Sequence, residues 1–158
     1  MARIPGLLED GLILADLLAT DKAGVIREFA DLLVSKGKVK DADELVRIVL
    51  ERESQGSTGI GDGIAIPHAK SRAVSDPVVV FGRSRRGVDF QTLDGKPADL
   101  FFLLISPEGR PGEHLKTLAR ISRIMRNAGL RERLRASRDR TEIEQLLFDE
   151  DGKHPACR

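Results

Sequence analysis

Tryptophan and tyrosine are absent from this sequence, and cysteine occurs only once in its 158 residues. The hydrophobic core must therefore be built from aliphatic side chains and six phenylalanines. The single cysteine, Cys157, lies one residue from the C-terminus and has no partner for an internal disulfide. A disulfide-stabilised fold is thereby excluded, and this cysteine usage is typical of a reducing compartment.

Long apolar runs are also lacking. No stretch approaches the roughly 20 apolar residues that a transmembrane helix requires. The first ten residues carry acids and a Pro-Gly pair where a signal peptide would have a continuous apolar segment. We therefore expect a cytoplasmic protein that does not insert into the membrane.

Neither sign of charge is in excess. The chain has 26 Lys and Arg against 25 Asp and Glu, so its net charge of +1 gives no general attraction to nucleic acid or membrane. Its 41% hydrophobic and 32% charged residues are typical of a soluble globular protein. A chain of this length is expected to form one domain with a sizeable core.

Hydrophobic periodicity and capping residues predict an alternation of helices and strands. Helices are expected at residues 21–37, 41–52 and 113–127, and after a capping box at Thr141 and Glu144. Strands are expected at residues 12–14, 64–66, 78–83 and 98–105. Long connections between strands favour a single-domain α/β fold with a sheet core, spanning residues 1–148. Residues 149–158 are expected to form a polar tail, in which His154 has no functional role.

The most informative segment runs from Gly56 to His68, with the sequence Gly-Ser-Thr-Gly-Ile-Gly-Asp-Gly-Ile-Ala-Ile-Pro-His. Four glycines in eight residues predict a contorted loop whose backbone can approach a ligand. A short buried strand follows, and Pro67 restricts the direction in which His68 leaves that strand. The loop lacks the Gly-Lys-Ser/Thr of a P-loop and the G-x-G-x-x-G dinucleotide pattern, which disfavours both kinds of nucleotide site. It also lacks the G-x-S-x-G elbow, so a hydrolase nucleophile of that type is excluded.

A histidine beside a loop rich in N–H and hydroxyl donors suits reversible phosphoryl chemistry on imidazole. A neutral imidazole nitrogen is available as a nucleophile near pH 7, and phosphoryl transfer mostly needs positioning and neutralisation of charge. His114 follows a second Gly/Pro-rich loop and is expected at the same edge of the sheet. Arg52 can offer its guanidinium to the phosphate oxygens, and residues 57–59 (Ser57, Thr58 and Gly59) can add hydrogen bonds.

Purely structural interpretations remain open for each of these residues. Taken singly, His68 and His114 are each more often satisfied structural histidines, and Arg52 is equally well explained as a cation that stabilises a helix C-terminus. Zinc binding is the weaker alternative, because two histidines lack a third ligand. Residues 110–140 contain ten Lys or Arg against three acids. They allow a basic binding module for nucleic acid or acidic proteins, although no aromatic is interleaved for base stacking.

The segment Arg52-Glu53 with residues 56–69 resembles the signature of IIA components of the bacterial phosphoenolpyruvate-dependent sugar phosphotransferase system. The class is the fructose/mannitol type, which includes the nitrogen-regulatory IIA proteins. The likeness extends to Phe81-Gly-Arg-Ser, Gly87-Val-Asp-Phe, Leu93-Asp-Gly, Leu100-Phe-Phe-Leu and His114-Leu115. It spans about residues 12–147.

This resemblance implies an α/β sandwich with a central mixed β-sheet flanked by helices. It implies that His68 accepts a phosphoryl group from a histidine-phosphorylated carrier of the HPr type, supported by His114 and Arg52, with no nucleotide, cofactor or metal. Two roles follow from it. A transport IIA passes the phosphoryl group to a IIB component for sugar uptake, whereas a nitrogen-type IIA changes its binding to other proteins. The lone domain and its basic helices favour regulation slightly.

Overall fold

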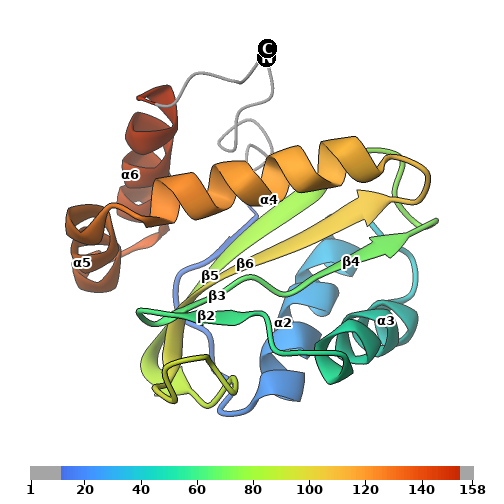
Figure 1. Ribbon diagram of the computed structural model, residues 1–158, viewed down its shortest axis with the longest axis horizontal. Helices are drawn as coiled ribbons and strands as arrows, with labels where there is room; N and C mark the ends of the chain where they lie inside the picture. The colour runs from blue at the N-terminus through green and yellow to red at the C-terminus, as the bar shows by residue number, and fades with distance from the viewer. Residues whose placement is uncertain (1–11, 154–158) are drawn as a thin grey trace.

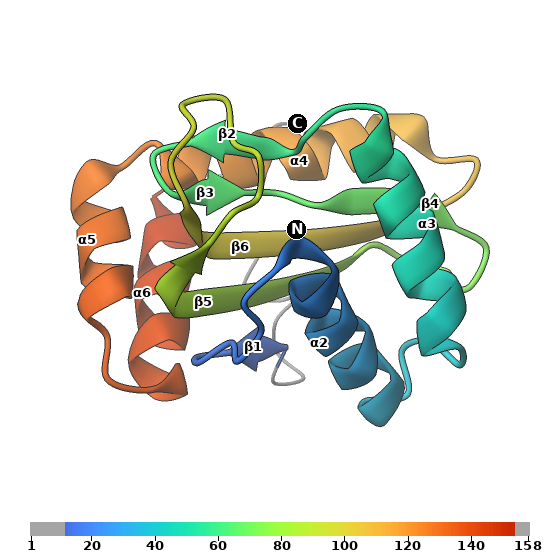
Figure 2. The ribbon, with the colours of Figure 1, turned by 90° about the horizontal axis from the view of Figure 1, so that it is seen from below.

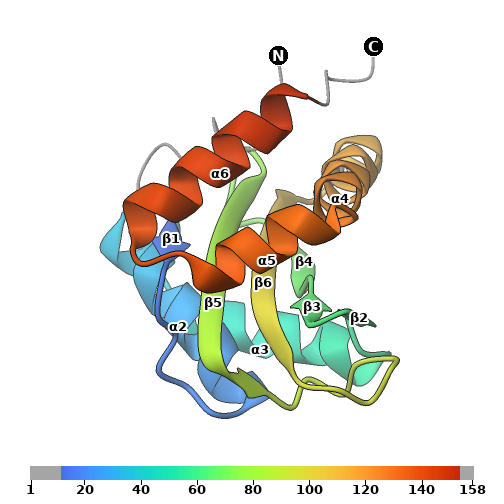
Figure 3. The ribbon, with the colours of Figure 1, turned by 90° about the vertical axis from the view of Figure 1, so that its left-hand side faces the viewer.

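The computed structural model describes residues 12–153, and it contains a mixed β-sheet between two layers of helices (Figures 1 and 3). The described strands are β1 (Ile13–Leu14), β2 (Gly59–Gly61), β3 (Ile64–Ala65), β4 (His68–Ser71), β5 (Val78–Val88) and β6 (Ala98–Pro107). The described helices are α2 (Lys22–Ser35), α3 (Ala42–Ser54), α4 (Pro111–Met125), α5 (Ala128–Ala136) and α6 (Arg140–Gly152). The predicted α/β sandwich with a central mixed sheet is confirmed.

The sheet is organised around β5 and β6, its two longest strands, which pair antiparallel. The strand order is β1-β5-β6-β3-β2, and β4 also pairs with β6, beyond the end of β3 (Figure 2). β1 runs parallel to β5, while β3 and β4 both run parallel to β6. Helices α2 and α3 cover one face of this sheet, and α4, α5 and α6 cover the other (Figure 3).

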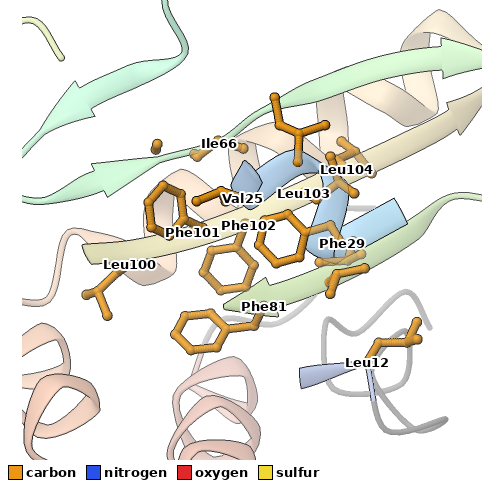
Figure 4. Packing of buried hydrophobic residues seen from close by; sticks show 14 of the residues in the cluster. Leu12, Val25, Phe29, Ile66, Phe81, Leu100, Phe101, Phe102, Leu103 and Leu104 are labelled. Atoms are coloured by element: carbon orange, nitrogen blue, oxygen red, sulfur yellow. The ribbon is translucent and has the colours of Figure 1, made fainter. Parts of the chain in front are cut away.

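Phenylalanine supplies the aromatic part of the core, as the lack of tryptophan and tyrosine requires. Phe101 of β6 meets Phe29 of α2 and Phe90 edge-on, at ring-centroid distances of 6.5 and 5.4 Å. Phe81 and Phe102 form a second edge-on pair at 5.0 Å. All five rings are fully buried. The close-up of the core shows Leu, Val and Ile side chains around Phe29, Phe81, Phe101 and Phe102 (Figure 4).

Asp side chains begin three of the helices. Asp21 accepts a hydrogen bond from the Gly24 N–H and Asp41 accepts one from the Glu44 N–H, so both predicted starts are confirmed. The last helix is capped by Asp139, through the Glu142 N–H at 2.9 Å. The capping box predicted at Thr141 and Glu144 is therefore wrong by two residues, because an acid earlier in the chain occupies the cap.

The predicted polar tail begins too early. Helix α6 continues to Gly152, so residues 149–152 belong to the folded domain. Glu150 and Asp151 are buried there. Arg120 of α4 donates to Asp151 at 2.6 Å and Asn127 donates to Glu150 at 3.1 Å, which explains how acidic residues are accommodated inside. His154 and Cys157 lie outside the described residues.

Three elements were not expected from the sequence, namely β2 within the glycine loop, β4 at His68, and α5. Their sequences are polar or glycine-rich. β4 forms by pairing with the distant β6, β2 pairs with the neighbouring β3, and α5 buries only two leucines, so none of them has a clear local pattern. Among residues 12–153, no helix is both long and apolar enough to cross a membrane.

Candidate functional site

The sheet brings His68 and His114 together at one edge. His68 is the first residue of β4 and lies opposite Leu104 of β6. β6 ends at Pro107 and leads directly into α4, whose first turn carries His114 (Figure 1). The two imidazole rings therefore lie 5.4 Å apart between centroids, tilted by 57°. The expectation that both histidines lie at the same sheet edge is confirmed.

His68 is half-buried, and its ring is oriented by the backbone just before it. Nδ1 lies 2.7 Å from the carbonyl oxygen of Ile66. Because a carbonyl oxygen can only accept, Nδ1 carries the proton and Nε2 keeps a free lone pair. Burial lowers the pKa of His68, and the charge of Arg52 lowers it further, against the opposing effects of the Ile66 hydrogen bond and Glu53. His68 is thus a neutral imidazole near pH 7 with a lone pair on Nε2.

His114 has the opposite arrangement. His114 is 6% exposed, and its Nδ1 lies 2.6 Å from the hydroxyl oxygen of Ser106, which is fully buried on β6. Burial, together with the charges of His68 and Lys70, lowers the pKa of His114 to about 4, so this ring is neutral at pH 7. A buried hydroxyl without an acceptor is costly, so we assign the Ser106 O–H as the donor to Nδ1. His114 then carries its proton on Nε2.

Arg52 lies in the last turn of α3, and its Nη1 donates to the carbonyl oxygen of Gly56 at 3.0 Å. This contact ties the guanidinium to the start of the glycine loop. Arg52, His68, His114 and Lys70 line an open depression of about 550 Å³, together with Glu51 and Glu108. Arg52 and Lys70 can donate hydrogen bonds to a small anion such as a phosphoryl group, while the carboxylates of Glu51 and Glu108 balance their charge.

The donors of residues 57–59 are engaged within the protein. The Ser57 hydroxyl donates to the carbonyl oxygen of Phe90 at 2.7 Å and accepts from the Gly59 N–H at 3.0 Å. The buried Thr58 hydroxyl donates to the carboxylate of Glu53. Gly59 lies so close to Thr92 that an added Cβ would be 2.5 Å from its methyl carbon. A direct phosphate contact from either hydroxyl would therefore require exchange of an existing hydrogen bond.

The sequence did not predict two residues of this site, Ser106 and Lys70, because no motif marks either of them. Ser106 is a single hydroxyl within the apolar run of β6, and only the pairing of elements reveals that it faces His114. Lys70, two residues after His68, contributes positive charge to the depression. Within residues 12–153, no group of three or more His, Cys, Asp or Glu is placed to hold a metal ion.

Ion pairs neutralise part of the basic stretch 110–140. At least four of its ten cations contact acids across or along the helices. These four are Arg110, Arg120, Arg135 and Arg138, with Glu113, Asp151, Asp99 and Glu142 as their partners. This pattern favours the interpretation of a solvated helix surface.

Comparisons with known proteins all indicate the same family. The family model described as "Phosphoenolpyruvate-dependent sugar phosphotransferase system, EIIA 2" matches residues 6–150. A fructose-specific EIIA component from Haloferax volcanii is 40% identical over 128 residues, which cover 81% of this chain and 83% of that protein. A nitrogen regulatory protein from Pseudomonas aeruginosa is 34% identical, covering 94% of this chain and 97% of its own.

Other relatives are larger or structurally characterised. The fructose-specific EIIABC component of Bacillus subtilis is 40% identical over 96% of this chain, which spans only 23% of that protein. The crystal structure of the nitrogen regulatory protein IIA-Ntr from Neisseria meningitidis superposes with a TM-score of 0.83 and 31% identity. That superposition covers 91% of this chain and 98% of the other.

Replacement of Ser106 by alanine tests the assignment of the His114 tautomer. We expect Ser106→Ala to shift the tautomer populations of His114 and to cost about 1 kcal/mol of stability, the usual size of a lost hydrogen bond. Imidazole ¹⁵N shifts and denaturant unfolding measure both effects. Ser35→Ala, whose hydroxyl bonds only a carbonyl of its own helix, is the control. Unchanged ¹⁵N shifts of His114 in Ser106→Ala would contradict the assignment.

The low pKa of His114 makes stability depend on pH. In the unfolded chain this histidine binds a proton near its ordinary pKa of 6.5, whereas the folded protein resists protonation until about pH 4. We therefore expect stability to fall as pH decreases from about 6.5 to 4, by roughly 3 kcal/mol from this group. Urea unfolding at several pH values measures this loss. In His114→Gln the free energy of unfolding should depend less steeply on pH. An NMR titration of His114 with a midpoint near pH 6.5 would contradict this prediction.

Proposed function

Because this chain belongs to the EIIA 2 family of the phosphoenolpyruvate-dependent sugar phosphotransferase system, we propose that it is a phosphoryl carrier that uses His68 as its acceptor. Its donor is a histidine-phosphorylated protein of the HPr type, and no nucleotide, cofactor or metal takes part. The reaction class is phosphoryl transfer through a phosphohistidine intermediate. A cytoplasmic location is part of the same proposal.

One feature carries the proposal, namely two adjacent imidazoles with different hydrogen-bond partners, from which we assign complementary protonation. His68 presents a lone pair on Nε2 while His114 presents a proton on Nε2, with their rings 5.4 Å apart. The first can attack phosphorus and the second can donate to a phosphoryl oxygen. Two structural histidines satisfied by solvent or core would not need opposite tautomers.

The transfer step proceeds in line. The Nε2 lone pair of His68 forms the new N–P bond as the N–P bond of the donor histidine breaks, and the donor nitrogen keeps that electron pair. Positive charge developing on the His68 ring is stabilised by its Nδ1–H bond to the Ile66 carbonyl. His114 and the guanidinium of Arg52 counter the charge on the phosphoryl oxygens.

Residues 57–59 have a secondary part in this proposal. The Ser57 and Thr58 hydroxyls and the Gly59 N–H can reach a phosphoryl group only by exchanging their present bonds to Phe90, Glu53 and Ser57. We propose that they mainly hold the loop in shape and that any direct phosphate contact forms after phosphorylation.

The fate of the phosphoryl group divides the relatives into two kinds. Some are named fructose-specific EIIA components and others nitrogen regulatory proteins. A mannitol IIA from Escherichia coli, whose structure superposes here at 27% identity, is described in complex with a phosphorylated IIB protein. Transfer to a IIB component supports sugar uptake, whereas a nitrogen-type role uses the added negative charge to alter docking of regulated proteins. Both are compatible with this site.

Phosphoryl acceptance is tested by labelling. We expect the purified protein to gain one acid-labile phosphoryl group from phosphoenolpyruvate, the general phosphotransferase enzyme and HPr, because His68 is neutral and its Nε2 is free. His68→Ala should abolish the label, whereas Ser35→Ala should keep it. Mass spectrometry at alkaline pH counts the group. Full labelling of His68→Ala would rule out the assigned acceptor.

A transfer assay separates the two fates. If the chain serves transport, its phosphorylated form should pass the group to a fructose-type or mannitol-type IIB cysteine within seconds, and His114→Ala should slow this step. If it serves regulation, transfer should be absent while partner binding depends on phosphorylation. Gel separation of labelled proteins measures transfer. Fast transfer from His114→Ala at the wild-type rate would remove the proposed role of that histidine.

A further inference from the structure

A buried ion pair that the transfer step does not use lies beneath the loop leading to His68. Glu53, the residue before the end of α3, has a side chain only 3% exposed. Nζ of Lys22, at the start of α2, lies 3.0 Å from Glu53 Oε1, and the Lys22 side chain is 16% exposed. Removing one partner of such a pair leaves a buried charge without compensation, so the two residues depend on one another.

A continuous series of hydrogen bonds connects this pair to the imidazole of His68. The Glu53 carboxylate accepts both the N–H of Thr58, at 3.3 Å, and the Thr58 hydroxyl. The Thr58 carbonyl accepts the N–H of Ile66 at 3.0 Å. The Ile66 carbonyl in turn accepts Nδ1–H of His68 at 2.7 Å. A shift of the Glu53 carboxylate would therefore move the backbone that orients the acceptor ring.

Lys22 also holds the segment on the other side of the loop. Its ammonium donates to the Gln91 side-chain oxygen at 2.9 Å and lies 4.7 Å from the ring centroid of Phe90. The Phe90 carbonyl accepts the Ser57 hydroxyl. One cation thus joins the helix that carries Glu53 to the chain segment that supports Ser57.

The charges of this pair bear on phosphorylation as well as on geometry. The Glu53 carboxylate raises the pKa of His68, in opposition to burial and Arg52, so its charge acts on the acceptor ring. A phosphoryl group brings further negative charge to the same place. A buried carboxylate deprived of its ammonium would oppose that charge, because the interior screens it poorly.

We infer that Lys22 and Glu53 form a positioning pair for phosphoryl acceptance, in which Glu53 fixes the loop that orients His68 and Lys22 neutralises Glu53 so that the phosphoryl group can be accommodated. This inference rests on the proposed function. Neither residue lines the depression around His68, so both act through other groups rather than by touching the phosphate.

The test compares Lys22→Met, Glu53→Gln and the double variant. We expect Lys22→Met to lower the rate of labelling by the HPr-type donor by roughly tenfold, the effect of one pKa unit of altered interaction. Glu53→Gln keeps the shape of the side chain and should leave the rate within about threefold of wild type, since its amide can still bond Thr58. The double variant should recover most of the rate that Lys22→Met loses, because no uncompensated carboxylate remains.

The chain offers a matched control between the same two helices. Arg27 of α2 and Asp43 of α3 form an exposed ion pair at 2.7 Å, so Arg27→Met and Asp43→Asn should leave the rate unchanged. Additive losses in the Lys22 and Glu53 double variant, or a wild-type rate in Lys22→Met, would overturn the inference.

An NMR titration of His68 tests the inference without a phosphoryl donor. It also does not depend on whether Lys22→Met folds. Glu53→Gln should lower the pKa of His68, while Asp43→Asn should leave it unchanged; an unmoved His68 titration in Glu53→Gln would contradict the role of Glu53. This readout also separates two failures. Absence of labelling in the wild-type protein would reject the proposed function, whereas a labelled wild type with equally active variants would reject only the positioning pair.

Discussion

The parallel pairing of β4 with β6 is the interaction on which this site depends. His68 lies opposite Leu104, and the strand continues through Ala69 to Ser71 beside the end of β6. The same end of β6 carries Ser106 and leads into α4 with His114. If β4 slipped by one residue, every side chain on it would change face, and the two imidazoles would separate. Backbone pairing between β4 and β6 thus helps to establish the 5.4 Å distance between the two imidazole rings.

The complementary protonation of the histidines comes from two different kinds of partner. A backbone carbonyl can only accept, so it determines the tautomer of His68 without any choice of side chain. His114 is instead oriented by a side-chain hydroxyl, which can donate or accept, and only the burial of Ser106 decides between the two. The tautomer of His68 is therefore insensitive to substitution of the neighbouring side chain, whereas the tautomer of His114 depends on one serine.

Local signals in the sequence predicted the helix starts and the two central strands. The helix starts at Asp21 and Asp41 follow from side-chain capping, and β5 and β6 follow from their apolar β-branched and aromatic runs. By contrast β4 begins with His-Ala-Lys-Ser, which has no strand pattern, and it exists because β6 offers a partner. Helix α5 buries only Leu130 and Leu134, too few for a periodic pattern. His68 and Arg52 could be found from the sequence, but Ser106 and Lys22 required the distances between elements.

The glycine loop shows that a glycine-rich sequence typical of ligand-binding loops can also be required by close packing. Gly59 lies against Thr92, and an added Cβ at Gly63 would be 2.4 Å from both Arg135 Nη2 and Asp99 Oδ1. Gly63 also has a φ of +77°, which a side chain would strain. The glycines therefore allow the chain to turn tightly between α3 and β3 while its donors reach Glu53, Phe90 and Asp94. Because those donors are directed inward, the proposed phosphoryl group on His68 would be stabilised chiefly by side chains. The protonation of His114 and the opposing charges of Arg52 and Glu53 would therefore determine how well the site holds it.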